Sequence, residues 1–324
     1  MRVYRSLDEA AAAQLHRPVV TLGMFDGVHI GHRSVIEHVV SVARERAGDP
    51  VVVTFGRHPR AIIEQSAPKL ITSLPHKLRI LEGLGVKFVV VLQFDEVLRA
   101  MPAREFARKV FGEVLQAEVV LLGYNNRFGR GGEGDIGLLR EVGVDAGFEA
   151  RQLKAVRLGA GSLSSTSIRE AILAGDLDRA ARMLGRLVSV LGTVERGDGI
   201  GKQLGFPTAN LDLHHEVRPP PGVYGCEAVV QGQRHFGLVN IGTRPTIHGG
   251  APPEGWEARD RQETVEVHLL DFEGDLYGQD VEVVFLVRFR AERRFDGVEA
   301  LVAQIKEDRA AFEAWLDGAR GRDR

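Results

Sequence analysis

The chain has 324 residues, of which 44% are hydrophobic and 27% are charged, and its formal net charge at pH 7 is −2. This length favours two domains over one, and the composition is that of a folded globular protein. The balanced charge excludes the broad basic surface that holds nucleic acid, although small anionic ligands need only local cations.

The number of cysteines and the distribution of apolar residues indicate where in the cell the protein is expected. Cys226 is the single cysteine, so an internal disulfide is excluded. Polar residues such as Asp8 and Gln14 interrupt the apolar core that a signal peptide would need. No apolar stretch approaches the roughly 20 residues that span a bilayer. We therefore expect a cytoplasmic protein without a membrane segment.

Up to about residue 185, short β-branched segments alternate with helical patterns. The expected strands are 19–22, 51–55, 88–94 and 119–122. Apolar residues three and four apart predict helices around 35–43, 78–84 and 106–115. This alternation is typical of a doubly wound parallel α/β sheet, whose ligands bind at the carboxyl ends of the strands.

After Gly185 the pattern changes to short strands between glycine and proline turns. The expected strands are 187–194, 222–230, 236–241, 264–270 and 281–289. Their spacing predicts a small antiparallel β-barrel, and an apolar stripe from Leu301 to Trp315 predicts a final helix over 298–316 that closes one side of it. The predicted domains are therefore 1–185 and 186–324.

The segment TLGMFDGVHIGH places two histidines where a helix follows the first of these strands. His29 and His32 are three residues apart, so their side chains project to one side and can face a bound phosphate. Taken alone, such a pair is also consistent with a structural role. Its place after a strand of a parallel sheet, among Gly23, Asp26 and Gly31, favours an anion site.

Two further segments of this half carry features of phosphate sites. In SLSSTSIREAILAGD, hydroxyls at 164–166 precede Arg169, although a capped helix with an exposed arginine explains the same residues. In GYNNRFGRGGEGD, a polar glycine-rich loop follows the strand that ends at Leu122, and a flexible surface loop is an equal alternative.

Together these segments resemble the nucleotidyltransferase domain of the prokaryotic riboflavin kinase/FAD synthetase family, in order over residues 19–185. FDGVHIGH is similar to its HxGH motif, TFGRHP to its TFxxHP element, GYNNRFGRGGEGD to its flavin-side loop and SSTSIR to its SSTxIR motif. The resemblance implies direct attack of the FMN phosphate on the α-phosphorus of ATP, with Mg²⁺ present and pyrophosphate leaving. Catalysis would then come from alignment and charge stabilisation.

The resemblance also implies residue roles. His29 and His32 would contact the reacting phosphates, and Arg169 would contact the ATP tail. The other implied ATP contacts are Gly23, Phe25, Asp26, Gly31, Ser164, Ser165 and Thr166. Asn125 would contact the reacting centre or the flavin phosphate, and Arg127 would also lie on the flavin side. Asn126 stands where relatives commonly carry an aromatic residue, so we do not count it as a contact.

The second half contains GDGIGKQLGFPTANL, a glycine-rich stretch that ends in Thr208 and Asn210. It is not a Walker A loop, because no Ser or Thr follows Lys202, but its backbone N–H groups can cradle phosphate oxygens. Thr208 and Asn210, two apart on an extended segment, point the same way and offer two oxygens to one Mg²⁺. A β-turn followed by a strand explains the same residues.

Glu266 lies in TVEVHLLDF, between Val265 and Val267, which face the opposite side of a strand. A strand glutamate is usually a solvated residue, but the neighbouring motifs favour a functional one. The second half resembles the riboflavin kinase module of the same family over residues 187–310, through GxxxGxxLGFPTAN, PPPGVYG, NIGTRPT, VEVHLLDFEGDLYG and VRFRAERRF in the family's order.

This second resemblance implies that Glu266 takes the proton of the terminal ribityl hydroxyl of riboflavin, while Thr208 and Asn210 hold Mg²⁺ against the ATP phosphates. The implied phosphate contacts are Gly197, Gly199, Gly201, Lys202 and Gly205, and the implied flavin or lid contacts are Asn240, Arg290 and Phe295. Lys202 replaces a common arginine and loses its bidentate fork. Ile247 replaces a common phenylalanine.

The resemblance as a whole implies a bifunctional enzyme that phosphorylates riboflavin to FMN and then adenylylates FMN to FAD, with ATP as co-substrate of both reactions. Two alternatives stay open. One is a nucleotidyltransferase for another phosphorylated substrate, such as pantetheine phosphate, because HxGH is shared across that superfamily; LGFPTAN argues against it. The other is a flavin-binding carrier or regulatory protein, against which the retained His29, His32 and Glu266 argue.

Overall fold

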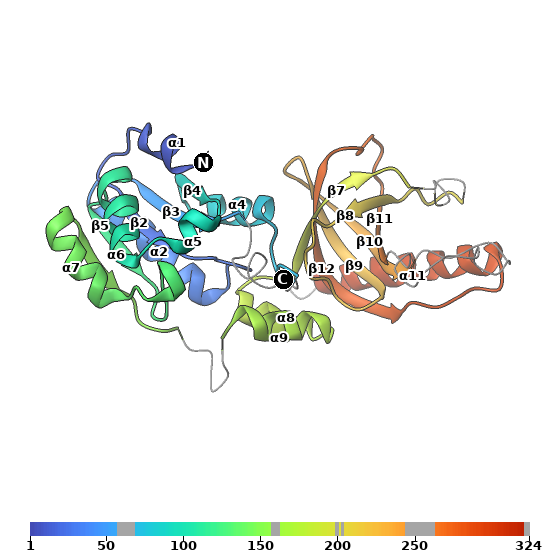
Figure 1. Ribbon diagram of the computed structural model, residues 1–324. Helices are drawn as coiled ribbons and strands as arrows, with labels where there is room; N and C mark the ends of the chain where they lie inside the picture. Colours follow the sequence, from blue (N-terminus) through green and yellow to red (C-terminus); the bar gives the residue numbers. More distant parts are fainter. Residues whose placement is uncertain (57–68, 157–162, 198–200, 202–203, 244–262, 321–324) are drawn as a thin grey trace, which may run out of the picture. The chain divides into compact units, whose positions relative to one another are not determined.

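The structure is a computed structural model that describes residues 1–56, 69–156, 163–197, 201, 204–243 and 263–320. Its contacts divide the chain into two compact units, Met1–Ile168 with Met183–Gly185 and Arg169–Arg182 with Arg186–Arg324. The first unit holds a parallel sheet and the second a closed antiparallel barrel (Figure 1). The predicted fold class is confirmed, and the boundary between residues 185 and 186 stays a prediction.

Six strands form the sheet of the first unit: β1 (Arg2–Tyr4), β2 (Val19–Leu22), β3 (Pro50–Phe55), β4 (Phe88–Leu92), β5 (Val119–Leu122) and β6 (Glu149–Gln152). They pair in parallel in the order β1-β4-β3-β2-β5-β6. From β2 the chain adds β3 and β4 on one side and then returns to add β5 on the other. The strand order therefore reverses between β2 and β5, which is where doubly wound sheets bind ligands.

Helices connect these strands and bury the sheet. Their bounds are α1 (Leu7–Ala11), α2 (Ile30–Glu45), α4 (Leu74–Gly83), α5 (Glu96–Ala100), α6 (Ala103–Phe106), the π-helix η1 (Ala107–Val114), the 3₁₀ turn η2 (Arg130–Gly132) and α7 (Ile136–Ala146). Two further helices, α8 (Ser165–Leu173) and α9 (Leu177–Leu184), follow β6, and their residues Arg169–Arg182 belong to the second unit. Strands β2 and β5 are buried along their whole length. Continuous Val and Leu runs give this two-sided burial, as expected of a central parallel strand.

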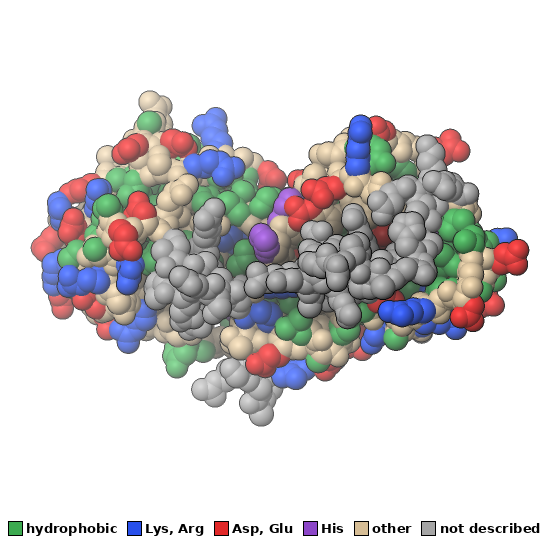
Figure 2. Space-filling view, turned by 45° about the vertical axis from the view of Figure 1, so that its right-hand side comes forward, with side chains coloured by type: hydrophobic (Ala, Val, Ile, Leu, Met, Phe, Trp, Pro, Cys, Tyr) green, Lys and Arg blue, Asp and Glu red, His purple; other side chains and the backbone are tan. Residues whose placement is uncertain are grey.

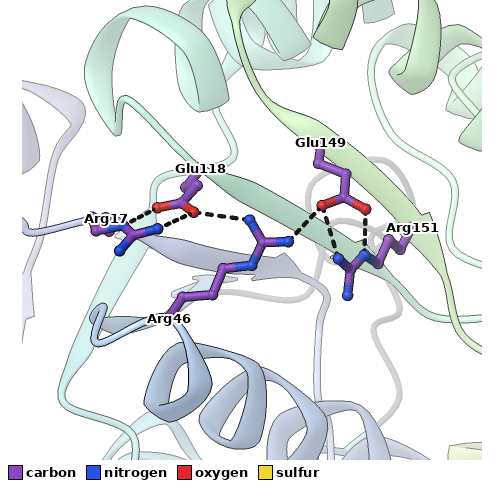
Figure 3. A network of polar contacts seen from close by, with 5 residues as sticks. All are labelled: Arg17, Arg46, Glu118, Glu149 and Arg151. Carbon is purple, nitrogen blue, oxygen red and sulfur yellow. Dashed lines mark hydrogen bonds and ion pairs between the residues drawn. The ribbon is translucent and has the colours of Figure 1, made fainter.

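A chain of ion pairs joins the amino ends of β2, β5 and β6 (Figure 3). Glu118 accepts hydrogen bonds from Arg17, at 2.6 and 2.9 Å, and from Arg46 at 2.9 Å. Arg46 also bonds Glu149 at 2.9 Å, and Glu149 is held by Arg151 at 2.6 and 2.8 Å. Hydrogen bonds from the two arginines lower the pKa of Glu118 to about 2. This edge of the sheet thus has its charges paired with one another.

The barrel of the second unit has the strands β7 (Ser189–Glu195), β8 (Ala209–Asp212), β9 (Gly222–Val230), β10 (Gln233–Thr243), β11 (Glu263–Leu269) and β12 (Asp280–Ala291). They close in the order β10-β11-β8-β7-β12-β9. Side chains alternate between the two faces of a strand. Val239, Val265 and Val267 are therefore buried in the core, while Asn240 and Glu266 lie on the other face.

Helix α11 (Val298–Arg320) covers part of that other face and confirms the predicted closing helix. Phe312 is fully buried and packs with Val223 and Leu238 in one cluster. Burying an aromatic side chain of this size is a large apolar contribution to stability.

The single cysteine lies in the barrel. Cys226 on β9 is fully buried, and burial raises the pKa of its thiol.

Acidic and basic side chains are interspersed over the face seen in Figure 2, in keeping with the small net charge. Among the described residues, no helix combines the length and the apolar character needed to cross a membrane.

Two candidate active sites

The turn after β2 has an unusual backbone. Gly27 has φ +78°, and Phe25 and Val28 have φ +49° and +39° although neither is a glycine. A β-branched residue such as Val28 rarely enters this region, and such strain persists only where the surroundings hold it in place. Here the side chains of Phe25 and Val28 are both buried. The turn is thus a strained, anchored structure and not a free loop.

Polar contacts add to this anchoring. The carboxylate of Asp26 accepts the backbone N–H groups of Ile71 at 2.9 Å and Thr72 at 3.2 Å. The N–H of Gly27 donates to the hydroxyl of Thr72 at 3.0 Å. Ser165 at the start of α8 donates to the carbonyl of Asp26 at 3.0 Å. The side chain of Asp26, a predicted ATP contact, therefore holds the turn together.

The two histidines meet at the start of α2. His29 is the N-cap, and its Nδ1 accepts the backbone N–H of His32 at 3.3 Å. The two rings stack with centroids 3.6 Å apart, and His32 also meets the ring of Phe25 edge to face at 5.3 Å. The structure confirms that they lie side by side at a helix start, where N–H groups and the helix dipole favour an anion.

Burial keeps His32 uncharged. Burial first, then the positive charges of His29 and Lys77, hold the pKa of His32 well below its ordinary 6.5. Its buried Nδ1 has no hydrogen-bond partner in the described part of the chain. A neutral imidazole that donates from one nitrogen is suited to bind a phosphate oxygen without changing its own charge.

Two predicted glycines leave space for these rings. A Cβ on Gly23 would lie 2.9 Å from the ring of Phe25. A Cβ on Gly31 would lie 3.2 Å from the ring of His29 and 3.2 Å from Leu163. Both distances are shorter than ordinary contacts. These glycines therefore permit the ring packing, which is a more specific role than lining a phosphate.

The hydroxyl segment caps α8. The N–H of Ser167 donates to Ser164 Oγ at 3.1 Å, and the N–H of Ser164 donates back to Ser167 Oγ at 3.2 Å. This reciprocal pattern resembles a capping box. Arg169 lies one turn further along the same helix and is half-buried. Ser164 thus caps the helix and Ser165 reaches the turn after β2, while the contacts of both residues with ATP stay a prediction.

The loop after β5 carries two predicted contacts, Asn125 and Arg127, and the side chains of both are exposed. Thr166 in α8 is exposed as well. Arg127 pairs with Asp135 at 3.3 Å. Asn126 donates to the carbonyl of Leu22 at the end of β2, which turns its amide inward. The loop is therefore fastened beside the histidine turn, and Asn125 is exposed next to that fastening.

Lys77 on α4 was not predicted. Its side chain is buried, and its Nζ donates to the carbonyls of Met24 and Phe55, at 3.0 and 3.3 Å, and to Thr54 Oγ1 at 3.0 Å. The sequence did hold a signal, because Lys77 lies between Leu74 and Leu81 on the apolar stripe of this helix.

The TFGRHP element is described only in part. Its residues Arg57, His58 and Pro59 lie outside the described residues.

In the second unit, register brings three predicted residues into one row. Asn210 of β8 is the cross-strand partner of Glu266 on β11, and Glu266 is the partner of Asn240 on β10. Directly opposite residues share a face and have Cβ atoms about 5 Å apart. Thr208 Oγ1 lies 3.5 Å from Glu266 Oε2. Thr208 and Asn210 thus lie beside Glu266, and their role as Mg²⁺ ligands stays a prediction.

The glycine-rich stretch approaches this row closely. A Cβ on Gly197 would overlap the amide of Asn210. One on Gly201 would lie 3.0 Å from Thr208 Oγ1 and 2.5 Å from the carbonyl of Phe206. Only glycine allows such an approach. Gly205 adopts φ +83° and is exposed. The predicted contacts Gly199 and Lys202, and the departure at Ile247, lie outside the described residues.

Arg290 of β12 contacts both α11 and the ring of Phe295. The guanidinium of Arg290 bonds Asp308 at 2.8 and 3.1 Å and lies 5.6 Å from the ring centroid of Phe295. Asp308 is almost fully buried, so this ion pair fixes the helix to β12. Direct flavin contact by Arg290 and Phe295 stays a prediction.

An open groove of about 540 Å³ lies next to Glu266 on the same face of β11. It is lined by Pro207, His268, Leu269, Asp271, Phe272, Glu273 and Arg309. His268 contacts the carbonyl of Pro207 at 2.9 Å, and its buried Nε2 has no hydrogen-bond partner among the residues described here. His268 was not predicted, although it is two residues from Glu266 and therefore on the same face.

Comparison with known proteins agrees with this division into two sites. The FAD synthetase family model matches residues 11–167, and the riboflavin kinase family model matches residues 184–316. The bifunctional riboflavin kinase/FMN adenylyltransferase of Escherichia coli K12 is 35% identical over 310 residues, which cover 95% of this chain and 96% of that protein. The chain belongs to this family.

A second relative and a solved structure also cover most of the chain. The Bacillus subtilis 168 protein of the same description is 33% identical over 297 residues, which cover 90% of each chain. A solved structure from Streptococcus pneumoniae, described as a macrolide-efflux protein, is 28% identical and superimposes with a TM-score of 0.78 over 97% of this chain and 99% of its own. Both folds of this family member therefore recur together in one solved chain.

Proposed function

We propose that this chain phosphorylates riboflavin to FMN through residues 186–324 and adenylylates FMN to FAD through residues 1–185, with ATP as co-substrate of both reactions. One observation supports this most strongly. Each region matched by a family model has its own convergent set of polar side chains, the histidine turn in one and the Asn210–Glu266–Asn240 row in the other.

In the kinase reaction, the terminal ribityl hydroxyl attacks the γ-phosphorus of ATP, the bond to the β-phosphate oxygen breaks, and ADP leaves. A carboxylate of Glu266 accepts the proton of that hydroxyl. The neighbouring amides of Asn240 and Asn210 orient the polyol and the phosphates, because they share the face of Glu266. Positioning and charge neutralisation supply most of the catalysis in such a transfer.

Mg²⁺ fits the donors beside Glu266. Thr208 offers a hydroxyl oxygen and Asn210 an amide oxygen, and hard oxygen ligands are those that Mg²⁺ prefers. Within the described residues, no group of three or more His, Cys, Asp and Glu side chains is placed to hold a metal ion. Thr208 and Asn210 would therefore supply only part of the ligands of a bound Mg²⁺, and phosphate oxygens of ATP would supply others. The ion would neutralise part of the phosphate charge.

In the adenylylation, a phosphate oxygen of FMN attacks the α-phosphorus of ATP and pyrophosphate leaves. No proton has to move, so the protein mainly aligns two anions that repel each other. His29 and His32 donate N–H groups to the phosphate oxygens as charge shifts among them. Ser165 and Arg169 follow on α8 and bind the rest of the triphosphate, in keeping with the bond from Ser165 to the turn.

The groove next to Glu266 suits a planar heteroaromatic ring. Its lining combines Phe272 with polar groups of His268 and Arg309, a mixture typical of small-molecule sites. We assign to it the isoalloxazine ring of riboflavin or the adenine ring of ATP.

The test is to incubate the purified chain with riboflavin, ATP and Mg²⁺ and to separate the flavins by chromatography over time. We expect FMN to rise first and FAD to follow. Formation of FAD from supplied FMN but no FMN from riboflavin would remove the kinase assignment. Binding of flavin without any product would favour the carrier alternative, and turnover of pantetheine phosphate instead of FMN would favour another nucleotidyltransferase.

A further inference from the structure

A buried ammonium group lies beneath the histidine turn. Lys77 is 3% exposed, although a lysine at a helix surface normally reaches water. Burial lowers its pKa from 10.5 to about 8, so holding the charge here carries an energetic cost. A buried cation of this kind is retained where it does something that an apolar side chain cannot do.

The contacts of Lys77 join two separate chain segments. Met24 lies in the turn after β2, and Thr54 and Phe55 lie at the carboxyl end of β3. The Nζ donates to one oxygen of each of these three residues, at 3.0 to 3.3 Å, so its three N–H groups are all used. Thr54 Oγ1 itself donates to the carbonyl of Met24 at 3.2 Å. The ammonium is thus the centre of a junction between the two strand ends.

This junction precedes the strained turn directly. Met24 is next to Phe25, whose φ is +49°, and His29 follows four residues later. Strain of this kind relaxes unless the segment is fixed at both ends. Asp26 fixes the middle of the turn through Ile71 and Thr72, and Lys77 fixes its beginning.

We propose that Lys77 is a positioning residue for adenylylation: its ammonium ties the ends of β2 and β3 together and so holds the turn that sets His29 and His32 against the phosphates. The inference rests on the proposed function of this unit. Lys77 need not touch the substrate, because the cavity that it lines with Met24 and Phe55 holds only about 10 Å³.

The charge of Lys77 adds a second effect at the same place. Two titratable groups of the described residues interact with its charge, Asp26 of the turn and His32 of α2. Asp26 favours the charged form of Lys77, and Lys77 in turn disfavours the charged form of His32. Removing the ammonium should therefore raise the pKa of His32. If Lys77 only filled space, its removal would leave that pKa unchanged.

The experiment compares Lys77→Met with Lys87→Met in the full chain. Methionine keeps much of the length of the side chain and removes the ammonium. Lys87 pairs with Asp49 at the opposite edge of the same sheet, so its variant controls for the loss of one positive charge. FAD formation from supplied FMN and ATP is measured across pH 6 to 9.5, roughly the range that brackets the lysine and histidine titrations, and riboflavin phosphorylation is measured in the same samples.

We expect Lys77→Met to lower the turnover of adenylylation by about 10²-fold, the effect of a misplaced reacting group, with phosphorylation unchanged. Wild-type adenylylation should fall relative to phosphorylation as Lys77 loses its proton near pH 8, and the variant should lack this fall. Lys87→Met should behave like wild type. Thr54→Val, which removes one of the three acceptors but leaves the ammonium, should give a smaller loss in the same direction.

Histidine NMR gives a readout that does not need turnover. In protein with labelled histidine side chains, the signal of His32, identified by its loss in His32→Asn, should titrate at higher pH in Lys77→Met than in wild type. If wild type makes no FAD, the proposed function is wrong, and the titration then tests only whether the charge of Lys77 acts on His32. Superimposable His32 titrations together with full adenylylation activity in Lys77→Met would overturn the proposal. If Lys77→Met does not fold, Thr54→Val and the wild-type pH profile decide it.

Discussion

The two sites use different ways to hold polar groups in place. The histidine site is built at strand ends from a strained turn, whose backbone is fastened by contacts from α4 and α8. The site around Glu266 is a row across three paired strands, and its side chains are half-buried or exposed. Strand pairing fixes the geometry around Glu266, whereas the histidine site depends on single side-chain contacts such as those of Lys77 and Ser165. Substitutions at these contacts should therefore affect only adenylylation, and phosphorylation should respond only to substitutions in the row around Glu266.

The largest effect is expected at Glu266. Glu266→Gln keeps the size of the side chain but cannot accept a proton, and loss of a general base typically costs about 10²- to 10⁴-fold in rate. Riboflavin phosphorylation should fall by this amount, with riboflavin and ATP binding largely retained, because the register of β11 is unchanged. Glu227→Gln, on the same barrel, is the matched control. Phosphorylation by Glu266→Gln at close to the wild-type rate would make Glu266 an ordinary strand residue.

His32→Ala tests the other side of the comparison. Removing one preorganised donor typically costs about 10²- to 10³-fold in turnover, so FAD formation from FMN should fall by this order. The kinase should be unaffected, because its row contains no residue of the turn. Equal losses of both activities would indicate a folding defect and would contradict the independence of the two sites.

Thr208→Val should have an intermediate effect. The substitution keeps the shape of the side chain and removes the hydroxyl beside Glu266. If Thr208 holds Mg²⁺, half-maximal phosphorylation should require a higher Mg²⁺ concentration, and excess Mg²⁺ should restore most of the rate. An unchanged Mg²⁺ dependence would remove Thr208 from the metal site. Adenylylation in the same samples is the control for free Mg²⁺ and ATP.

The smallest effect concerns the ion pairs at the amino edge of the parallel sheet. The pKa of Glu118 is about 2 in the folded chain and 4.5 without its partners. Its contribution to stability is therefore fully present above pH 4.5 and is lost as the pH falls toward 2. Glu118→Gln should slightly lower the midpoint of thermal unfolding at pH 7, and the difference from wild type should shrink below pH 4. The pairs are partly exposed, so the shift should be small, and neither activity should change.

Much of the fold could be predicted because the pattern is local. Strands β2, β5 and β9 have the predicted bounds, since continuous apolar runs or strict alternation mark them. The edge strands β1 and β6 were missed because they are short and carry polar residues, and β8 was expected only as an extended segment after a turn, without bounds, because it lacks a continuous apolar run. The helix expected over 106–115 is present, but most of it is π-helical, which spacing does not reveal.

The sites were predicted unevenly for a related reason. His29 and His32 are close in sequence, so helix geometry was enough to bring them together. The alignment of Asn240, Glu266 and Asn210 depends on the pairing of strands that are distant in sequence, and no local pattern gives that register. Lys77 was overlooked because its meaning lies in the carbonyls that it contacts, which only the folded chain brings to it.

The burial of Cys226 has a practical consequence. Its thiol is fully buried and its pKa is raised, so it should not react with maleimide dyes while the chain is folded. Because it is the single cysteine of the sequence, new cysteines placed on exposed positions can be labelled without a background signal. One fluorophore on each unit would then allow energy transfer between them to be followed during turnover, first with riboflavin and then with FMN.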